Sequence, residues 1–362
     1  MPTTPAADPV TETGRSATAS GSRRTGPTRV VWMPLLLLLV PSAICLGVLA
    51  SRGIPSPAVL GLPDPGLLTR WGLPVVRGLR DGSAALTIGL LLMGAALLPG
   101  AGPPGRRASF ESGHLRAARL AAAFGLMWTA CAALLLGLTY SELVGVPPAS
   151  DLAGVLPFVT GVGLGRSLAT SAVLSLAATC LAALATHATT LRWALAAAVA
   201  AVLPLALTGH ALGAAHRDLA VGAQAAHVMG ASVWVGGLGA LLLLGSGLGP
   251  ELPSVASRYS TLAGAAYVVT AVSGVCAALA QLDAWSGLRT SYGLLLSAKA
   301  LAFVCLGAVG WGHRRWTLPR LAETDERRRA AFWRLAAAEV ALMAVVLGLA
   351  GALAGTPPPA HG

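Results

Sequence analysis

The sequence predicts an all-α polytopic membrane helix bundle, on the basis of its composition, its apolar runs and their periodicity. Hydrophobic residues make up 55% of the 362 positions and charged residues 11%, and the mean hydropathy is +0.72. Because soluble domains carry about 25% charged residues, this chain lacks the polar surface of a cytosolic enzyme or of a disordered protein. Runs of about 20 apolar residues recur, each long enough to cross a membrane as a helix. Their side chains do not alternate in polarity, so they do not predict barrel strands.

Nine such runs predict about nine transmembrane helices. The expected spans are residues 32–50, 79–98, 117–140, 166–186, 192–212, 220–244, 261–282, 292–312 and 333–354. Residues 1–29 are rich in Thr, Ser, Ala, Pro and Arg and predict a disordered cytoplasmic tail. The first span follows basic residues as a signal peptide does, but its apolar core is long and Ser51-Arg52-Gly53 is a poor cleavage site. We expect it to be retained, with a cleaved or peripheral first segment as the alternative.

The distribution of arginine predicts an N-terminus inside and a C-terminus outside. Subtracting 14 acidic from 25 basic residues gives a net charge of +11, and in a membrane protein basic residues mark the cytoplasmic loops. With the N-terminus inside, 17 of the 24 arginines fall in cytoplasmic segments. Four of the remainder fall in the first external loop, namely Arg52, Arg70, Arg77 and Arg80. Because the arginines sort by membrane side, we exclude nucleic-acid binding.

Two histidines of the fifth and sixth spans are the principal candidate ligands. The midpoint between His210 and His227 falls in the turn of a predicted antiparallel hairpin, so the two imidazoles should face each other. Both should lie about one turn inside the membrane at the external end. Gln224, His227 and Trp234 share one helix face. That face should point into the bundle, because polar groups bare in hydrocarbon are costly.

This arrangement predicts metal binding. Imidazole binds copper, zinc, iron and nickel, and a thioether favours the reduced, soft form of copper. His216, in the short loop, is the expected entry ligand. Met229 is a weaker candidate, because it lies to the side of the His227 face. Two alternatives stay open: the imidazoles are hydrogen-bonded core residues that lock the hairpin, or they hold haem between two helices.

Lys299 and Glu339 are two further polar residues within the spans, where an ionisable group indicates function. Lys299 is the single lysine of the chain and lies in the eighth span, and Glu339 lies in the ninth. One hypothesis pairs the two along an ion path. The alternative has Lys299 extending its head group to the external interface. His187 and His313, beside arginines at cytoplasmic helix ends, are expected to be solvated.

The cysteines and the absence of enzyme motifs in the sequence narrow the function further. Five cysteines fall singly in apolar runs without a CxxC pair, so we expect no disulfide framework. The sequence has no nucleotide-binding loop, no HExxH motif and no Ser/His/Asp order. We therefore expect that this protein is not an enzyme.

The C-terminal half resembles the copper-resistance protein D (CopD) family of bacterial inner-membrane proteins. The resemblance rests first on Gly209-His210-Ala211 and on His227 with Trp234-Val235-Gly236-Gly237-Leu238. Further matches are Arg258-Tyr259-Ser260, Tyr292-Gly293 leading to Lys299, and a last helix with Arg334 and Glu339 that ends at Thr356-Pro357-Pro358. We therefore expect three parts: the tail at 1–29, N-terminal membrane helices at 30–160 and a CopD-like membrane domain at 165–358.

The resemblance implies copper handling at the bacterial cytoplasmic membrane. The family is commonly described as moving copper inward or supplying it to copper proteins, so it implies a copper ion as the bound metal. Expected partners are the lipid bilayer and an extracytoplasmic copper chaperone or an oxidase assembly factor. Two other function classes stay open: a haem-binding membrane redox protein, and a non-catalytic assembly partner of respiratory copper enzymes.

Overall fold

The computed structural model describes residues 32–51, 53, 64–99, 104–148, 150–206, 217–281, 289–322 and 326–356. This part of the chain is helical and contains no strand. The long helices are α1 (Trp32–Ser51), α2 (Gly66–Leu92), α3 (Pro104–Val144), α5 (Gly163–Ala183), α6 (Ala188–Ala206), α7 (Arg217–Leu244), α8 (Leu252–Gln281), α9 (Ser291–Gly312) and α10 (Glu326–Ala354). The short helix α4 (Val155–Gly161) precedes α5, and the π-helical turns η2 (Met93–Leu97) and η7 (His313–Thr317) extend α2 and α9.

Each of the nine expected spans overlaps one of these long helices, and the all-α membrane fold is confirmed. Within the described ranges, seven helical segments are long and apolar enough to cross a membrane. They are Gly66–Leu97, Ser112–Val144, Gly163–Ala183, Val221–Gly247, Gly249–Leu279, Ser291–Thr317 and Ala330–Ala354. The other two, Leu36–Ser51 and Ala188–Pro204, are shorter apolar helices.

The expectation of a long first external loop was wrong. Helix α2 begins at Gly66, thirteen residues before the expected span. It includes Arg70 and Arg77, which are half-buried, and Arg80, which is buried. At the helix start, the Asp64 carboxylate accepts a hydrogen bond from the Gly66 N–H at 2.9 Å. Pro65 has no N–H, so it could not make the backbone hydrogen bond that a helix starting several residues earlier would require. The Thr69 hydroxyl lies 2.8 Å from the Ser141 hydroxyl of α3. This polar contact with α3 therefore stabilises the segment as a helix, although its arginines predicted a loop.

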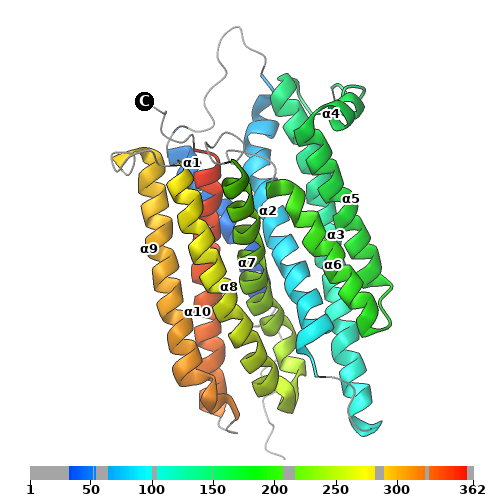
Figure 1. Cartoon of the computed structure of the whole chain (residues 1–362), viewed down its shortest axis with the longest axis vertical. Coiled ribbons are helices and arrows are strands. Elements are labelled where there is room, and N and C mark those ends of the chain that lie inside the picture. The colour runs from blue at the N-terminus through cyan, green and yellow to red at the C-terminus, as the bar shows by residue number, and fades with distance from the viewer. Residues whose placement is uncertain are drawn as a thin grey trace, which may run out of the picture.

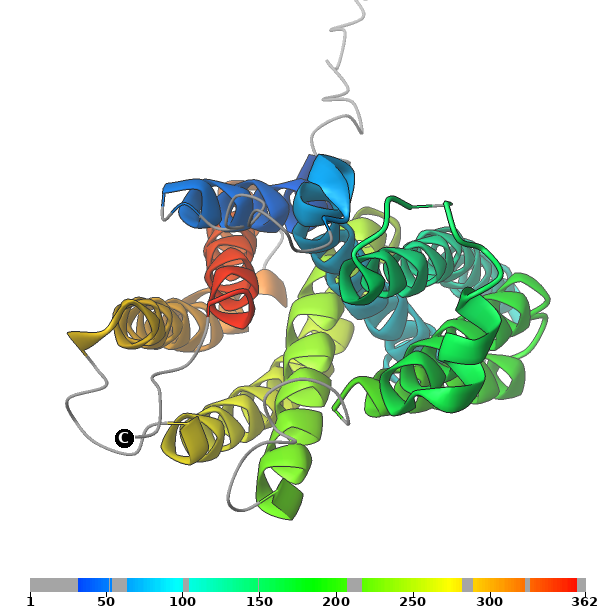
Figure 2. The same cartoon turned by 90° about the horizontal axis from the view of Figure 1, so that it is seen from above.

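The helices form two neighbouring groups. On one side α2, α3, α5 and α6 pack together, and on the other side α7 packs against α8 while α10 packs against α1 and α9. The two groups are joined mainly where α2 crosses α7 (Figures 1 and 2). Viewed from above, α1 and α7 run obliquely to the other helices (Figure 2). The first helix, α1, packs against the last helix, α10.

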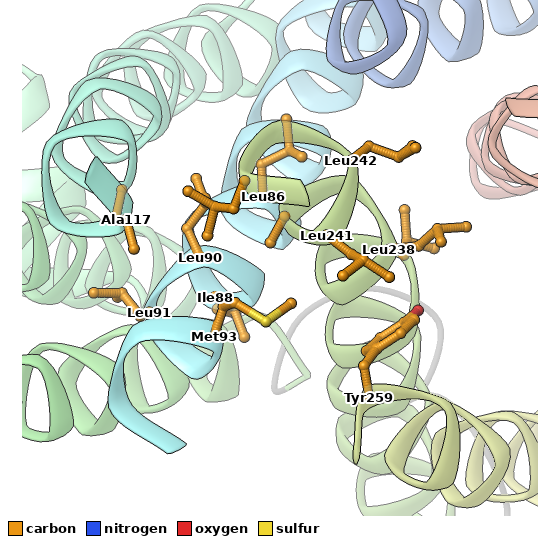
Figure 3. Packing of buried hydrophobic residues seen from close by; sticks show 14 of the residues in the cluster. Leu86, Ile88, Leu90, Leu91, Met93, Ala117, Leu238, Leu241, Leu242 and Tyr259 are labelled. Atoms are coloured by element: carbon orange, nitrogen blue, oxygen red, sulfur yellow. The ribbon is translucent and has the colours of Figure 1, made fainter. Parts of the chain in front are cut away.

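The core lies at the crossing of α2 and α7. Leu86, Ile88 and Leu90 of α2 are fully buried, and Leu238 and Leu242 of α7 are nearly so. Figure 3 shows these side chains around the crossing, with Leu90 on the side of α2 toward Ala117 of α3 and with Leu238 and Leu242 on the side of α7 away from α2. Most of the buried side chains here are apolar, and the buried hydroxyls of Ser83 and Thr87 on α2 donate to backbone carbonyls of the same helix. Leucine rows from two helices therefore build a close-packed interior in the middle of the bundle.

The two ends of the bundle differ in charge. In Figure 1 the upper end carries the start of α7 and the end of α10, and the lower end carries the end of α9 and the start of α10. We refer to them as the upper end and the lower end. The arginine-bearing ends of α3, α6, α8 and α9 all lie at the lower end. The lower end is therefore the one that the arginine distribution assigns to the cytoplasm.

Candidate metal site

His227 lies on α7 toward the upper end and is held by α8. It comes ten residues after Arg217, the first residue of α7, which is about 15 Å along the helix axis. Its Nδ1 atom lies 3.0 Å from the Thr270 carbonyl oxygen and 3.4 Å from the Ser273 hydroxyl. Because a carbonyl oxygen only accepts hydrogen bonds, Nδ1 carries the proton and donates. The Nε2 atom is then the deprotonated nitrogen, which is the one that can bind a metal.

A glycine makes room for this imidazole. A Cβ atom at Gly274 of α8 would lie 3.3 Å from His227 Cε1, which is tighter than ordinary van der Waals contact. The imidazole is half-buried and lies within electrostatic range of the Lys299 ammonium on α9. The sequence therefore provides the ring with a fixed orientation, a fixed tautomer and a neighbouring positive charge.

His227 and Trp234, which share one face of α7, both lie against α8. Trp234 on this face is 5% exposed and contacts Tyr267 of α8, with ring centroids 5.1 Å apart. Gln224 and Met229 are both half-buried on the same helix. His210 and His216 lie outside the described residues, so the facing pair of imidazoles and the entry ligand stay predictions. Among the residues that the structure does describe, no group of three or more His, Cys, Asp or Glu side chains could hold a metal.

Glu339 is paired with His313 at the lower end. The Glu339 Oε2 atom lies 3.0 Å from His313 Nδ1, and the two residues are 6% and 8% exposed. The expectation of a solvated His313 was wrong, because α9 continues into η7 and keeps the imidazole on the side of α10. His187 is exposed, as expected. No ion pair joins Lys299 to Glu339 among the salt bridges of the described chain.

Sequence reasoning could have found the His313–Glu339 pair. The residue midway between the two is 326, where α10 begins, so the hairpin argument that predicts a pair of His210 and His227 also predicts one depth for these two side chains. A carboxylate inside a span needs a partner, and His313 is the titratable side chain at that level of the neighbouring helix. The signal was obscured because two arginines follow His313 directly and suggest a solvated helix end.

Sequence reasoning also missed a polar pair in the middle of α2. Arg80 is 9% exposed, and its Nε atom donates to the Asp81 Oδ1 atom at 2.9 Å. Asp81 lies well inside α2 rather than close to a helix start, which the expected span of 79–98 implied. The apolar run that predicts the span begins at residue 79, so it does not include the more polar first half of the same helix.

The His313–Glu339 pair borders a cavity of about 260 Å³ between α7, α8, α9 and α10. Its wall includes the aromatic side chains of Trp234, Tyr259, Tyr267, Trp311 and Phe332.

All five cysteines are free, in agreement with the expectation: Cys45 and Cys131 are buried, Cys276 is half-buried, and Cys180 and Cys305 are exposed. The fold and these sites define a polytopic helical membrane protein with a half-buried imidazole toward one end of its bundle and a buried imidazole toward the other.

Comparison with known families identifies the chain. Residues 67–219 match the family model described as "Copper resistance protein D-like, N-terminal domain", and residues 253–353 match "Copper resistance protein D". The chain belongs to the copper resistance protein D family, and it is a multi-pass membrane protein with a role in copper resistance. The N-terminal match extends to residue 219, beyond the expected division at 160–165. No curated protein matches the chain, and no solved structure matches it.

Proposed function

We propose that this protein transports or delivers copper at the cytoplasmic membrane, and that copper binds near the upper, external end through His227. The observation that carries this proposal is the hydrogen bond from His227 Nδ1 to the Thr270 carbonyl. It fixes the tautomer whose Nε2 lone pair faces away from the backbone contact and is available to a metal. An outer hydrogen-bond partner on the non-ligating nitrogen is the usual support of a metal-binding histidine.

The other ligands in this proposal are His210 and His216, with Met229 as an additional thioether ligand. Imidazole with thioether selects copper over the harder divalent metals. A copper ion is bound more weakly when a positive charge lies close to it, and Lys299 acts on the same imidazole. A cation near the site favours release over permanent storage, which is what a transport or delivery protein requires.

The first experiment is metal analysis with an ultraviolet and visible spectrum of the full chain purified in detergent. The variants are His227→Ala and His210→Ala/His227→Ala, and the matched control is His187→Ala, because His187 is exposed at the other end of the bundle. We expect about one copper per chain in the wild type and the control. We expect its loss in both variants, without a change in the elution profile.

The other outcomes select the alternatives. A Soret band in the wild type that is lost in His227→Ala would favour a haem-binding redox protein. Unchanged copper in the double variant would refute the histidine site. If neither copper nor haem is present, the histidines serve packing and the protein acts as an assembly partner of a copper enzyme. Copper-loaded extracytoplasmic chaperones can then be tested as donors by mixing them with the apo chain.

A further inference from the structure

The acid–base pair at the lower end has no role in the proposed copper site. His313 follows Lys299 by fourteen residues on α9 and η7, which is about 21 Å along the helix axis. His313 and Glu339 are both more than nine-tenths buried. Buried ionisable side chains in a membrane bundle are costly unless they are paired, and they indicate function. This pair therefore calls for an explanation separate from the His227 site.

The pair is built to hold one proton. Glu339 Oε2 accepts from His313 Nδ1 at 3.0 Å, so Nδ1 carries a hydrogen whether the imidazole is neutral or charged. With a neutral imidazole the pair carries one negative charge, and with an imidazolium it carries none. In a medium of low dielectric constant the net neutral pair is less costly than an uncompensated carboxylate. A proton at His313 Nε2 is the difference between the two states.

His313 Nε2 is the nitrogen of the ring that the hydrogen bond to Glu339 does not use. It is buried and has no hydrogen-bond partner among the residues that the structure describes. A buried imidazole nitrogen without a partner is uncommon, since such groups are normally satisfied by the protein or by water. Because His313 and Glu339 both border the cavity, a water molecule that enters it can approach the pair.

The surrounding groups leave Glu339 dependent on this proton. From α8, Tyr259 interacts with the carboxylate electrostatically, but its hydroxyl already donates to the Trp234 carbonyl at 2.6 Å. From η7, Arg314 borders the cavity, but it is exposed and donates to the Ser260 carbonyl at 3.4 Å. The side chains that α7 contributes to the cavity are apolar: Trp234, Leu238 and Leu241. Neither of these neighbours replaces the imidazolium as the direct partner of the carboxylate.

The helix opposite the carboxylate is shaped to receive it. A Cβ atom at Gly310 of α9 would lie 3.0 Å from Glu339 Oε1. An alanine there would press on the carboxylate and disturb its alignment with His313. Both polar side chains are thus seated at defined positions on neighbouring helices.

We propose that the His313–Glu339 pair is a proton-binding site, and that copper moving through the bundle is exchanged for a proton at this pair. The coupling rests on the proposed copper function, but the proton site does not. For each Cu⁺ that moves to the lower side, the pair releases one H⁺ toward the upper side and takes up one H⁺ from the lower side. The exchange leaves the net charge of each side unchanged, and it involves no oxidation or reduction.

The proton site is tested by infrared difference spectra of the full chain between acidic and alkaline buffer. The variants are Glu339→Gln, which keeps the shape of the side chain, and His313→Gln, and the control is Glu142→Gln, an exposed carboxylate at the end of α3. We expect a proton-dependent imidazole signal that is lost in His313→Gln, changed in Glu339→Gln and intact in the control. Superimposable spectra of the wild type and Glu339→Gln would overturn the proposal, even if His313→Gln does not fold.

The coupling is tested in vesicles that contain a trapped pH dye and are supplied with Cu⁺. We expect about one proton to move against each copper in the wild type and the control. In Glu339→Gln we expect copper flux to fall at least tenfold while copper stays bound at His227. An unchanged ratio of protons to copper in Glu339→Gln would overturn the exchange. If the wild type binds copper but moves none, transport and the exchange both fail. The metal analysis then still decides whether copper binds at His227, and the infrared spectra decide whether the pair binds a proton.

Discussion

At the scale of single residues, glycines determine where polar side chains fit between the helices. His227 lies against Gly274, Glu339 lies against Gly310, and the Tyr259 ring lies against Gly237. In each case a Cβ atom would collide with, or press on, the polar side chain of the next helix. Because lipid provides no hydrophobic force between helices, small residues that permit close approach contribute much of the packing.

Among the described glycines, Gly236 of α7 lies directly against the backbone of α2. A Cβ atom there would collide with the Ala85 carbonyl of α2, and a backbone atom cannot move aside as a flexible side chain can. We expect Gly236→Ala to lower the free energy of unfolding by about 1–3 kcal/mol, the usual cost of overpacking. The measurement is thermal unfolding in detergent.

The matched control for this prediction is Gly137→Ala on α3. A Cβ atom at Gly137 would have no heavy atom within 4 Å. There we expect stabilisation of about 0.5–1 kcal/mol, because alanine has the higher helix propensity. Equal melting temperatures for the two variants would show that the α2–α7 crossing is looser than the packing implies.

Asp151, just outside the membrane, should make the turn before α4 sensitive to acid. The hydrogen bond from the Tyr140 hydroxyl, at 2.5 Å, lowers the pKa of the Asp151 carboxyl, and the Gly154 N–H lowers it further. The charged form therefore stabilises the folded turn above the ordinary carboxyl pKa, and this contribution is lost as the pH falls through the lowered value.

We expect amide exchange at Gly154 to accelerate when the pH is lowered below about 4, the ordinary carboxyl range, after correction for the intrinsic exchange rate. Asp151→Asn should abolish this pH dependence. Hydrogen exchange followed by mass spectrometry measures it. The same acid response in Asp151→Asn would assign the effect to another group.

At the scale of elements, an aromatic layer joins α7, α8 and α9 between the two polar sites. The rings of Tyr267 and Phe303 are stacked, with centroids 4.6 Å apart and planes at 8°. Trp234 meets both rings edge-on, at 5.1 Å from Tyr267 and 5.6 Å from Phe303. Along the three helices this layer lies between His227 and the His313–Glu339 pair.

The stacked pair should be energetically coupled. We expect a double-mutant cycle of Tyr267→Leu and Phe303→Leu to give an interaction energy of about 0.5–1.5 kcal/mol, as for other aromatic pairs. Unfolding in denaturing detergent measures it for the two single variants and the double variant. Strict additivity of the two single variants would show that α8 and α9 are not held together by this contact.

At the scale of the whole molecule, the charge asymmetry predicts the orientation in the membrane. The described arginines Arg116, Arg192, Arg258 and Arg314 lie on four different helices, and all are at the lower end. By the bias of basic residues toward the cytoplasm, the lower end should be inside. The His227 site then faces the outside, and the His313–Glu339 pair lies near the cytoplasm.

Reporter fusions test this orientation. Alkaline phosphatase fused after Gly362 should be active and a fluorescent protein there should be dark, while the reverse is expected for fusions in the 245–251 connection. The reason is that phosphatase requires the outer compartment and the fluorescent protein requires the cytoplasm. Opposite results at both positions would invert the membrane assignment of both proposed sites.

The candidate site was predictable only in part. The spacing of Gln224, His227 and Trp234 predicts a face that points inward, and the structure places His227 and Trp234 against α8 as that face requires. The spacing does not predict which helix receives the face. The helical repeat fixes directions around one helix axis, whereas the neighbour depends on contacts across the bundle.

The sequence alone determined that the chain is a helical membrane bundle, that its basic residues gather at one end and that its C-terminal half is similar to CopD proteins. Hydropathy and charge are properties of local segments, so they are visible in the linear chain. The tertiary structure alone decided that α2 begins thirteen residues before the expected span and that α1 packs against α10. These features depend on depth, helix direction and close packing between segments far apart in sequence, which no local pattern contains.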